Sequence, residues 1–206
     1  MKKIVFFLSV LFIFSCKKEI KTTISPWVAY DETEELAKNA THEIGRMQYK
    51  LIQSKFLDKN EIWKMVADQI ASFSEEEYEK LKPFILEQDI PTIQSHIQSG
   101  RLSYEKLTQW YLFRIVKFEN DKDKTLHSII ALNPNAVEEA RQRDKNIDKE
   151  NHPIYGMPIL LKDNINTSEM KTTAGAHALL ENQTGDAFIA VSYTHLRAHE
   201  TREDLV

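Results

Sequence analysis

Lys162 is the residue whose position best suits acid–base chemistry. It directly follows the apolar run PILL, which ends at Leu161, and it precedes Asp163 and Asn164. A lysine drawn to the edge of an apolar core loses hydration, which favours the neutral amine, and a neutral amine can act as a general base. The alternative is an exposed Lys162 that pairs with Asp163. The residues alone leave these two interpretations open.

Cys16, the single cysteine, follows an N-terminal sequence with the features of an export signal. Two lysines precede an apolar stretch at residues 4–14, which is too short to span a bilayer comfortably. Ile13, Ser15 and Cys16 resemble the box of bacterial lipoproteins, from which Phe14 departs. This resemblance implies a lipid on Cys16 and an anchor in the membrane of the cell envelope, facing the periplasm or the exterior. The alternative is an ordinary cleaved signal in which Cys16 has no role.

The composition excludes several classes of protein. The 206 residues carry 27 Lys+Arg against 31 Asp+Glu, a net charge of -4. This balance argues against a dedicated nucleic-acid binder, because such proteins neutralise phosphates with basic residues. One cysteine excludes an internal disulfide and a multi-cysteine zinc site. Only 5 glycines are present, which leaves little material for a glycine-rich phosphate loop.

Residues 31–94 are predicted to be helical, and we assign no chemistry to them. Apolar residues recur there at spacings of three and four, the pattern of a buried helix face. Ser74 and Glu77 have the spacing of a capping box, Pro83 is expected to bend or interrupt its helix, and Gly100 to end the last helix. The apolar positions are Leu36, Ala40, Ile44, Met47 and Leu51 in a first helix, Ile62, Val66 and Ile70 in a second, Tyr78, Leu81 and Ile85 in a third, and Ile93 and Ile97 in a fourth.

Residues 95–190 are predicted to alternate helices with short apolar strands, which favours an α/β sheet. The expected elements are a helix at 104–118 capped by Ser103, a strand at 126–132, a helix at 136–147 and a second strand at 157–161. The buried face of the first helix is predicted to hold Leu107, Tyr111, Ile115 and Phe118. Lys162 thus follows the C-terminal end of a buried strand, where α/β proteins place their sites.

Four segments have an order and spacing that point to a known family. GMPILLKDNI at residues 156–165 is followed by TTAG at 172–175, and segments that begin at Leu102 and Leu126 precede them. Together they resemble the amidase signature family over roughly residues 95–190. Ala176 is a departure, since many members have serine after TAG.

The resemblance implies a mixed sheet surrounded by helices and the hydrolysis of carboxamides by a Ser-cisSer-Lys mechanism. Lys162 would be the base that takes a proton from a bridging serine, which in turn deprotonates the nucleophilic serine. Backbone N–H groups form the oxyanion hole in such enzymes. The substrate would be a small-molecule or peptide amide, and neither a metal nor an organic cofactor is required.

The two serines of that mechanism are expected in a Gly/Ser-rich run downstream of Lys162, and the sequence has no such run. Only Ser168 and Ser192 follow Lys162, and neither is flanked by glycines. We therefore interpret the chain as an N-terminal fragment of an amidase that is inactive as given. The expected organisation is a lipoprotein signal peptide at residues 1–15, a tether at 16–30, a helical region at 31–94, a partial amidase domain at 95–190 and a non-native tail at 191–206.

The tail from Val191 has no clean period and resembles translated sequencing-adapter sequence. Leu196-Arg197 could instead be a pair of family residues displaced by an insertion. His195 and His199 have the spacing of a helical metal pair but lack further ligands.

Two other functions stay open at this point. One is a lipid-anchored helical binding module without catalysis, in which Lys162-Asp163-Asn164 is a remnant of the fold. The other is a transamidation subunit that feeds ammonia to a partner, against which the export signal argues.

Overall fold

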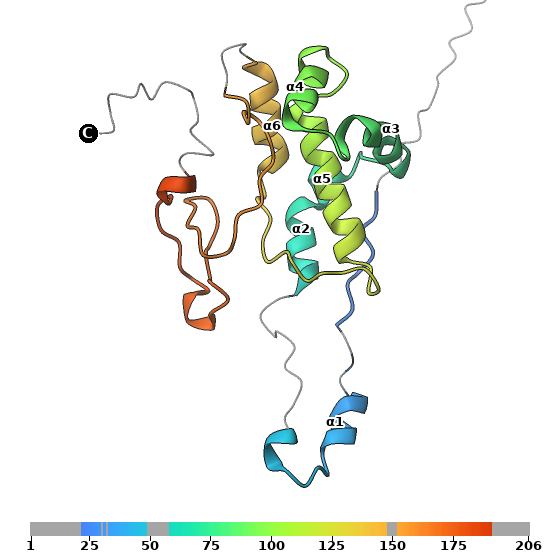
Figure 1. Cartoon of the computed structure of the whole chain (residues 1–206), viewed down its shortest axis with the longest axis vertical. Coiled ribbons are helices and arrows are strands. Elements are labelled where there is room, and N and C mark those ends of the chain that lie inside the picture. The colour runs from blue at the N-terminus through green and yellow to red at the C-terminus, as the bar shows by residue number, and fades with distance from the viewer. Residues whose placement is uncertain (1–21, 30, 32, 49–57, 148–151, 191–206) are drawn as a thin grey trace, which may run out of the picture.

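The computed structural model describes residues 22–29, 31, 33–48, 58–147 and 152–190, and within these ranges every regular element is helical. The elements are α1 (Thr33–Asn39), η1 (Gly45–Met47), α2 (Lys59–Ile70), α3 (Glu75–Ile85), α4 (Ile90–Gln98), α5 (Tyr104–Glu119), α6 (Ala136–Lys145) and η2 (His177–Leu179). Figure 1 shows α2 to α6 packed together, with α1 projecting from one end and residues 152–190 to one side. We call residues 58–147 the helical body and residues 152–190 the lysine segment.

The apolar core lies in the helical body and centres on α5. Every buried member of the core cluster lies between Ile62 and Ala140. Trp110 of α5 is fully buried, and its ring stacks on Tyr78 of α3 at a centroid distance of 4.9 Å. The indole N–H of Trp110 donates a hydrogen bond of 2.9 Å to the backbone carbonyl of Tyr78. Such aromatic pairs contribute roughly 0.5–1.5 kcal/mol beyond the burial of their area.

Side-chain caps begin α2, α3, α4 and α5. Asp58, Ser74, Asp89 and Ser103 each accept a hydrogen bond from a backbone N–H of the first turn, at 2.8, 3.2, 2.9 and 3.1 Å. The predicted caps Ser74 and Ser103 are thus confirmed. The Glu77 carboxylate, expected to complete the capping box, forms an ion pair of 2.6 Å with Lys106 of α5. Such caps typically contribute about 1 kcal/mol each.

Four predicted helices agree with the structure. The apolar faces at residues 62–70, 78–85 and 93–97 are buried in α2, α3 and α4, and α6 covers most of the helix predicted at 136–147. Gly100, with φ +73°, follows the end of α4 as predicted. Pro83 lies inside α3, which ends two residues later at Ile85.

The buried face of α5 differs from the prediction. Leu107 is buried, but Tyr111, Ile115 and Phe118 are only partly so. The buried residues are instead Tyr104, Leu107, Thr108, Gln109, Trp110, Leu112, Phe113, Val116 and Glu119. Helix α5 contacts α2, α3 and α6, so neighbours cover more than the single stripe that periodicity predicts.

The first predicted helix is wrong in length. Helix α1 has 7 residues and no buried side chain, and a turn separates it from η1. Ile44 and Met47 are 49% and 43% exposed, and Leu51 lies outside the described residues. Short helices are marginal without tertiary packing, and none of the described residues of this apolar stripe is buried.

The two predicted strands, at 126–132 and 157–161, have no regular secondary structure, so the predicted α/β sheet is absent from the described residues. Leu126 and Leu160 are 82% and 70% exposed. An extended segment becomes a strand only when a neighbour pairs with its N–H and C=O groups, and neither segment has that neighbour here.

Residues 22–27, which we call the N-terminal strap, lie extended against the helical body. The Thr22 N–H donates 2.7 Å to the Ala71 carbonyl, and Asn60 bonds both the N–H and the C=O of Trp27, at 2.8 and 2.9 Å. The amide of Asn120 donates to the Ser25 carbonyl at 2.5 Å. Part of the segment expected to be a tether is therefore docked. Among described residues, no helix is both long and apolar enough to cross a bilayer.

Candidate functional site

Lys162 lies in a stretch of the lysine segment without regular secondary structure and is exposed. Pro158, Ile159 and Leu160 before it are exposed too, so its stem is not drawn into a core edge as the apolar run suggested. Within the described ranges its ammonium has no hydrogen bond or ion pair, and the pairing with Asp163 does not form either. The ammonium is thus available to groups outside these residues.

Asp163, next to the lysine in the chain, accepts the hydrogen bonds that hold a turn at residues 172–175. Its carboxylate accepts hydrogen bonds from the N–H of Thr173 at 2.9 Å and of Gly175 at 3.3 Å, and from the Thr173 hydroxyl. Its backbone carbonyl accepts the N–H of Ala174 at 2.7 Å. Ala174 and Gly175 have φ of +49° and +72°, so the TTAG motif is a turn with left-handed backbone. Asp163 therefore holds together the two ends of the loop formed by residues 164–172.

Hydrogen bonds of backbone and side-chain groups also hold the rest of the lysine segment. Thr172 and Asn182 bond each other through backbone and side-chain amide groups, at 3.0 and 2.9 Å. The Ser168 N–H donates 2.6 Å to the Asp186 carboxylate, and the Ala187 N–H donates 2.9 Å to the Asn166 carbonyl. These bonds fold the segment back on itself, as its loops show in Figure 1.

A buried ion pair that the sequence analysis missed joins α2 to α5. The Lys59 ammonium contacts the Glu119 carboxylate at 2.8 Å and donates to the Glu119 carbonyl and the Thr125 hydroxyl, each at 2.9 Å. Glu119 also accepts from the Ser128 hydroxyl at 2.7 Å, which fixes the loop after α5. Both residues continue apolar stripes, Lys59 with Ile62 and Val66, and Glu119 with Leu112 and Val116. A charged residue in line with a buried apolar stripe was the feature of the sequence that could have predicted a buried ion pair.

The Glu119 carboxyl stays ionised over most of the pH range. Burial raises its pKa, but the hydrogen bonds from Lys59, Ser128 and Thr125 outweigh burial and lower the pKa from 4.5 to about 2. The pair lies far along the chain from Lys162 and within the body, so its role is structural.

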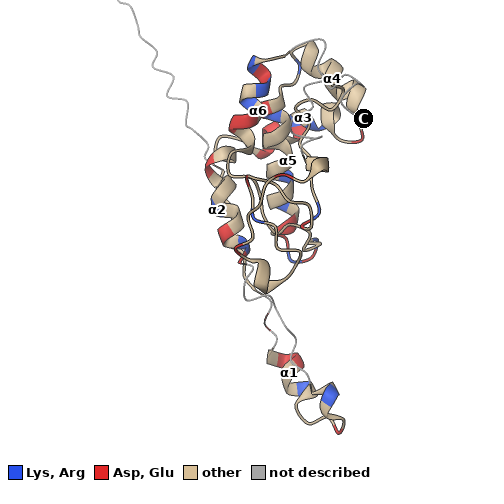
Figure 2. Ribbon diagram, turned by 90° about the vertical axis from the view of Figure 1, so that its left-hand side faces the viewer, with Lys and Arg blue, Asp and Glu red and all other residues tan. Residues whose placement is uncertain are grey.

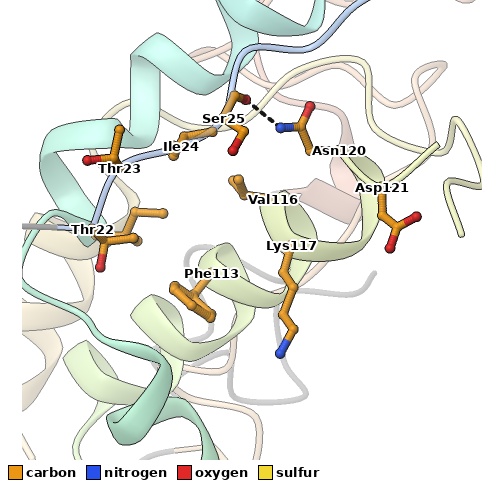
Figure 3. Close-up of a pocket in the computed structure, with 10 residues that line it drawn as sticks. Thr22, Thr23, Ile24, Ser25, Phe113, Val116, Lys117, Asn120 and Asp121 are labelled. Atoms are coloured by element: carbon orange, nitrogen blue, oxygen red, sulfur yellow. Dashed lines mark hydrogen bonds between the residues drawn. The ribbon is translucent and has the colours of Figure 1, made fainter. Parts of the chain in front are cut away.

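A groove of about 370 Å³ lies between the N-terminal strap and α5. Figure 3 shows Thr22 to Ser25 on one side, and Phe113, Val116 and Asn120 on the other. Its charged rim residues already have partners, since Lys117 pairs with Glu75 and Asp121 pairs with Lys124. Lys162 does not line it, so this groove is a packing seam rather than part of the candidate site.

Charges of both signs occur along α2 and α6 (Figure 2). Several are paired, and Arg141 of α6 contacts Glu105 of α5 at 2.8 Å. Where side chains are described, no group of three or more His, Cys, Asp or Glu is arranged to hold a metal ion. Several residues named in the sequence analysis lie outside the described residues: Cys16, Ser192, Leu196-Arg197, and the pair His195 and His199.

Known amidases are similar to the part of the chain that contains Lys162. Residues 107–197 match the family model described as Amidase. This part of the chain is amidase-like. A protein of Arabidopsis thaliana named "Probable amidase" is 36% identical over 101 residues, which are 47% of this chain and 19% of that protein. One subunit of the glutamyl-tRNA(Gln) amidotransferase of Exiguobacterium sibiricum is 31% identical over 98 residues, 48% of this chain and 19% of its own length.

A solved structure supports the same likeness. The crystal structure of an amidase family protein from Bacillus anthracis aligns with 67% of this chain and 28% of its own chain, with a TM-score of 0.62 and 32% sequence identity. The fold of the described residues therefore resembles part of an amidase-family structure. The chain spans about a fifth of the length of the first two curated relatives, 19% of each.

Proposed function

We propose that this amidase-like segment supplies the catalytic lysine of an enzyme that hydrolyses carboxamide C–N bonds, with Lys162 as the base. The observation that carries the proposal is the position of Lys162 inside the matched residues, next to a turn that Asp163 fixes. Its unpaired, exposed ammonium suits a group that completes its site with residues from elsewhere in a longer protein.

The proposed chemistry is the Ser-cisSer-Lys mechanism. In the complete site Lys162 would accept a proton from the bridging serine, which takes the proton of the nucleophilic serine as that oxygen attacks the amide carbonyl. The C–N bond breaks, the departing amine or ammonia takes the proton from Lys162 through the bridging serine, and an acyl-enzyme ester remains. Water then hydrolyses the ester and releases the carboxylic acid. No cofactor enters any step.

The two serines and the oxyanion loop belong, in this proposal, to the part of an amidase that these residues do not include. The relatives are about five times longer than the segments that match, since those segments cover 19% of them. We infer that the 206-residue chain alone has no amidase activity. Ammonia release from simple carboxamides by the purified chain, above that of buffer, would refute this inference.

The same missing part would supply the sheet. We propose that residues 126–132 and 157–161 become strands when neighbouring strands pair with them. Leu126 and Leu160, together with Phe188 at 82% exposure, form apolar surface that such a sheet and its helices would cover. The α/β class expected from the sequence is then a property of the complete domain.

Substitution of Lys162 tests the catalytic role in a full-length amidase that contains this segment. Lys162→Ala is expected to lower kcat by at least about 100-fold, because a general base contributes that much or more. Lys171→Ala is the matched control: Lys171 is also exposed, in the same segment, but pairs with Glu181. Near wild-type turnover by Lys162→Ala would contradict the assignment.

We further propose that Cys16 carries a lipid and holds the protein at the membrane of the cell envelope, facing the periplasm or the exterior. Several acyl chains, at roughly 0.8 kcal/mol per buried methylene, would anchor it firmly. Labelling of expressing cells with a radioactive fatty acid should mark the wild-type protein and leave Cys16→Ser unmarked. Equal label on both proteins would contradict lipidation at Cys16.

A further inference from the structure

A close contact ties the lysine segment to the helical body at Gly156. This glycine has φ +71°, and an ideal Cβ built on it would lie 2.5 Å from Cδ1 and Cε1 of Tyr104. Atoms at that separation overlap, so any side chain at position 156 forces the backbone or the ring to move. Tyr104 is the first residue of α5 and is 3% exposed, which leaves its ring little room to move.

Three helices hold this contact in place. The Tyr104 hydroxyl donates 2.8 Å to Oε1 of Gln94 on α4, and the Gln94 amide donates to the carbonyls of Pro153 and Tyr155, at 2.8 and 3.0 Å. The Tyr104 N–H donates 2.8 Å to the carboxylate of Asp144 on α6. The ring of Tyr155 meets that of Tyr104 edge to face at 5.7 Å.

The contact lies where the chain leaves the core on its way to Lys162. Met157 is partly buried against the core, whereas residues 158–160 are exposed. Downstream of the lysine, Asp163 fixes the next turn. The direction in which the chain leaves the helical body therefore sets where Lys162 lies, and that direction is fixed at Gly156.

We propose that Tyr104, through its contact with Gly156, is a positioning residue for Lys162. It touches neither substrate nor the reacting atoms. It fixes residues 153–157 on the helical body, and the Gln94 amide, bonded to the Tyr104 hydroxyl through its oxygen, donates to the carbonyls of Pro153 and Tyr155. The role of this contact in positioning a catalytic lysine rests on the proposed function. The contact between Tyr104 and Gly156 does not depend on it.

The test in the 206-residue chain compares two glycine variants. Gly156→Ala adds a methyl group against Tyr104, while Gly100→Ala adds one at a similar φ of +73° with nothing within 4 Å. Both variants carry the same backbone strain, so the difference between them reports the Tyr104 contact. We expect Gly156→Ala to speed amide hydrogen exchange at Tyr155 and Met157 at least tenfold, and Gly100→Ala to leave both amides unchanged. Equal rates in the two variants would overturn the contact.

A second pair of variants separates positioning from folding. Tyr104→Phe keeps the ring against Gly156 and loses only the bond to Gln94, so it should retain most of the exchange protection. Circular dichroism of Gly156→Ala should show the helical body still folded. If instead Tyr104→Phe loses protection as fully as Gly156→Ala, the ring contact is not what holds the segment.

Kinetics in the full-length amidase test the role toward Lys162. Gly156→Ala is expected to lower kcat at least tenfold with KM within twofold and with a displaced pH profile, and Tyr104→Phe to recover most of kcat. An unchanged kcat for Gly156→Ala, in an enzyme that Lys162→Ala inactivates, would overturn the positioning role. An enzyme that Lys162→Ala leaves active would refute the proposed function alone, since the exchange result does not depend on it.

Discussion

The helical body and the lysine segment are stabilised in different ways. The body has a continuous apolar core around Trp110, four capped helices and a buried ion pair. In residues 152–190 only Thr167, Thr172 and Ala190 are buried. This segment is held mainly by hydrogen bonds within its turns, such as that from the Thr173 N–H to the Asp163 carboxylate. The residue proposed for chemistry thus lies where less apolar area is removed from water than in the helical body. Its position depends on a few polar bonds and one glycine contact.

The largest expected effect tests the core of the helical body. Trp110→Ala removes a fully buried ring that stacks on Tyr78, and should lower the free energy of unfolding by about 3–5 kcal/mol. Urea denaturation followed by circular dichroism at 222 nm measures this change. A loss below about 1 kcal/mol would mean that the core does not depend on α5.

The next effect concerns pH and the buried ion pair of the body. The pKa of Glu119 is lowered to about 2 in the fold, so its contribution to stability is present above about pH 4.5 and is lost as the pH falls toward 2. That contribution is roughly 3 kcal/mol. Glu119→Gln lacks this titration, so the stability gap between wild type and variant should shrink between pH 5 and 2. A gap that stays constant in urea titrations over this range would contradict the role of Glu119.

A smaller effect is expected in the lysine segment. Asp163→Ala removes the acceptor of the Thr173 N–H but keeps the carbonyl that accepts the Ala174 N–H, and the Gly175 N–H keeps the Thr173 hydroxyl as an acceptor at 3.1 Å. Hydrogen exchange should accelerate roughly 5- to 30-fold at Thr173, as expected for about 1–2 kcal/mol of lost bonding, and less at Gly175. Ala174 is the internal control, and the stability of the helical body should not change. A fall in that stability would show that the two regions unfold together.

The smallest effect tests whether the exposed apolar residues of the segment matter within this chain. Phe188 is 82% exposed, so Phe188→Ala should change the free energy of unfolding by less than about 0.5 kcal/mol. Denaturation in urea gives the value. In a full-length amidase the same substitution should cost more, because Phe188 would be covered there. Equal effects in both proteins would refute the proposed covering.

Sequence reasoning succeeded where structure is local. Periodic apolar residues predicted α2, α3 and α4, and Ser74 and Ser103 marked two helix starts, because a helix and its cap are made by residues within one or two turns. The contacts of Lys59 with Glu119 and of Tyr104 with Gly156 join residues 60 and 52 positions apart, which no local pattern reveals.

At the candidate site, too, local features could be predicted from the sequence and long-range packing could not. Lys162 and its motif could be recognised from the sequence, but the exposure of the lysine could not. An apolar run such as PILL predicts burial only if something covers it. Among the described residues nothing covers residues 158–160, which are exposed. The predicted strands fail for the same reason, because a strand is defined by its neighbour.

If Cys16 carries a lipid, the docked strap limits how far the protein can stand from a membrane. Thr22 is bonded to Ala71, and five residues separate it from Cys16 in the sequence. The six residue-to-residue steps from Cys16 to Thr22 span at most about 20 Å when fully extended. The point at which the strap joins the helical body would then lie within about that distance of the lipid headgroups, so the body would be held at the bilayer surface.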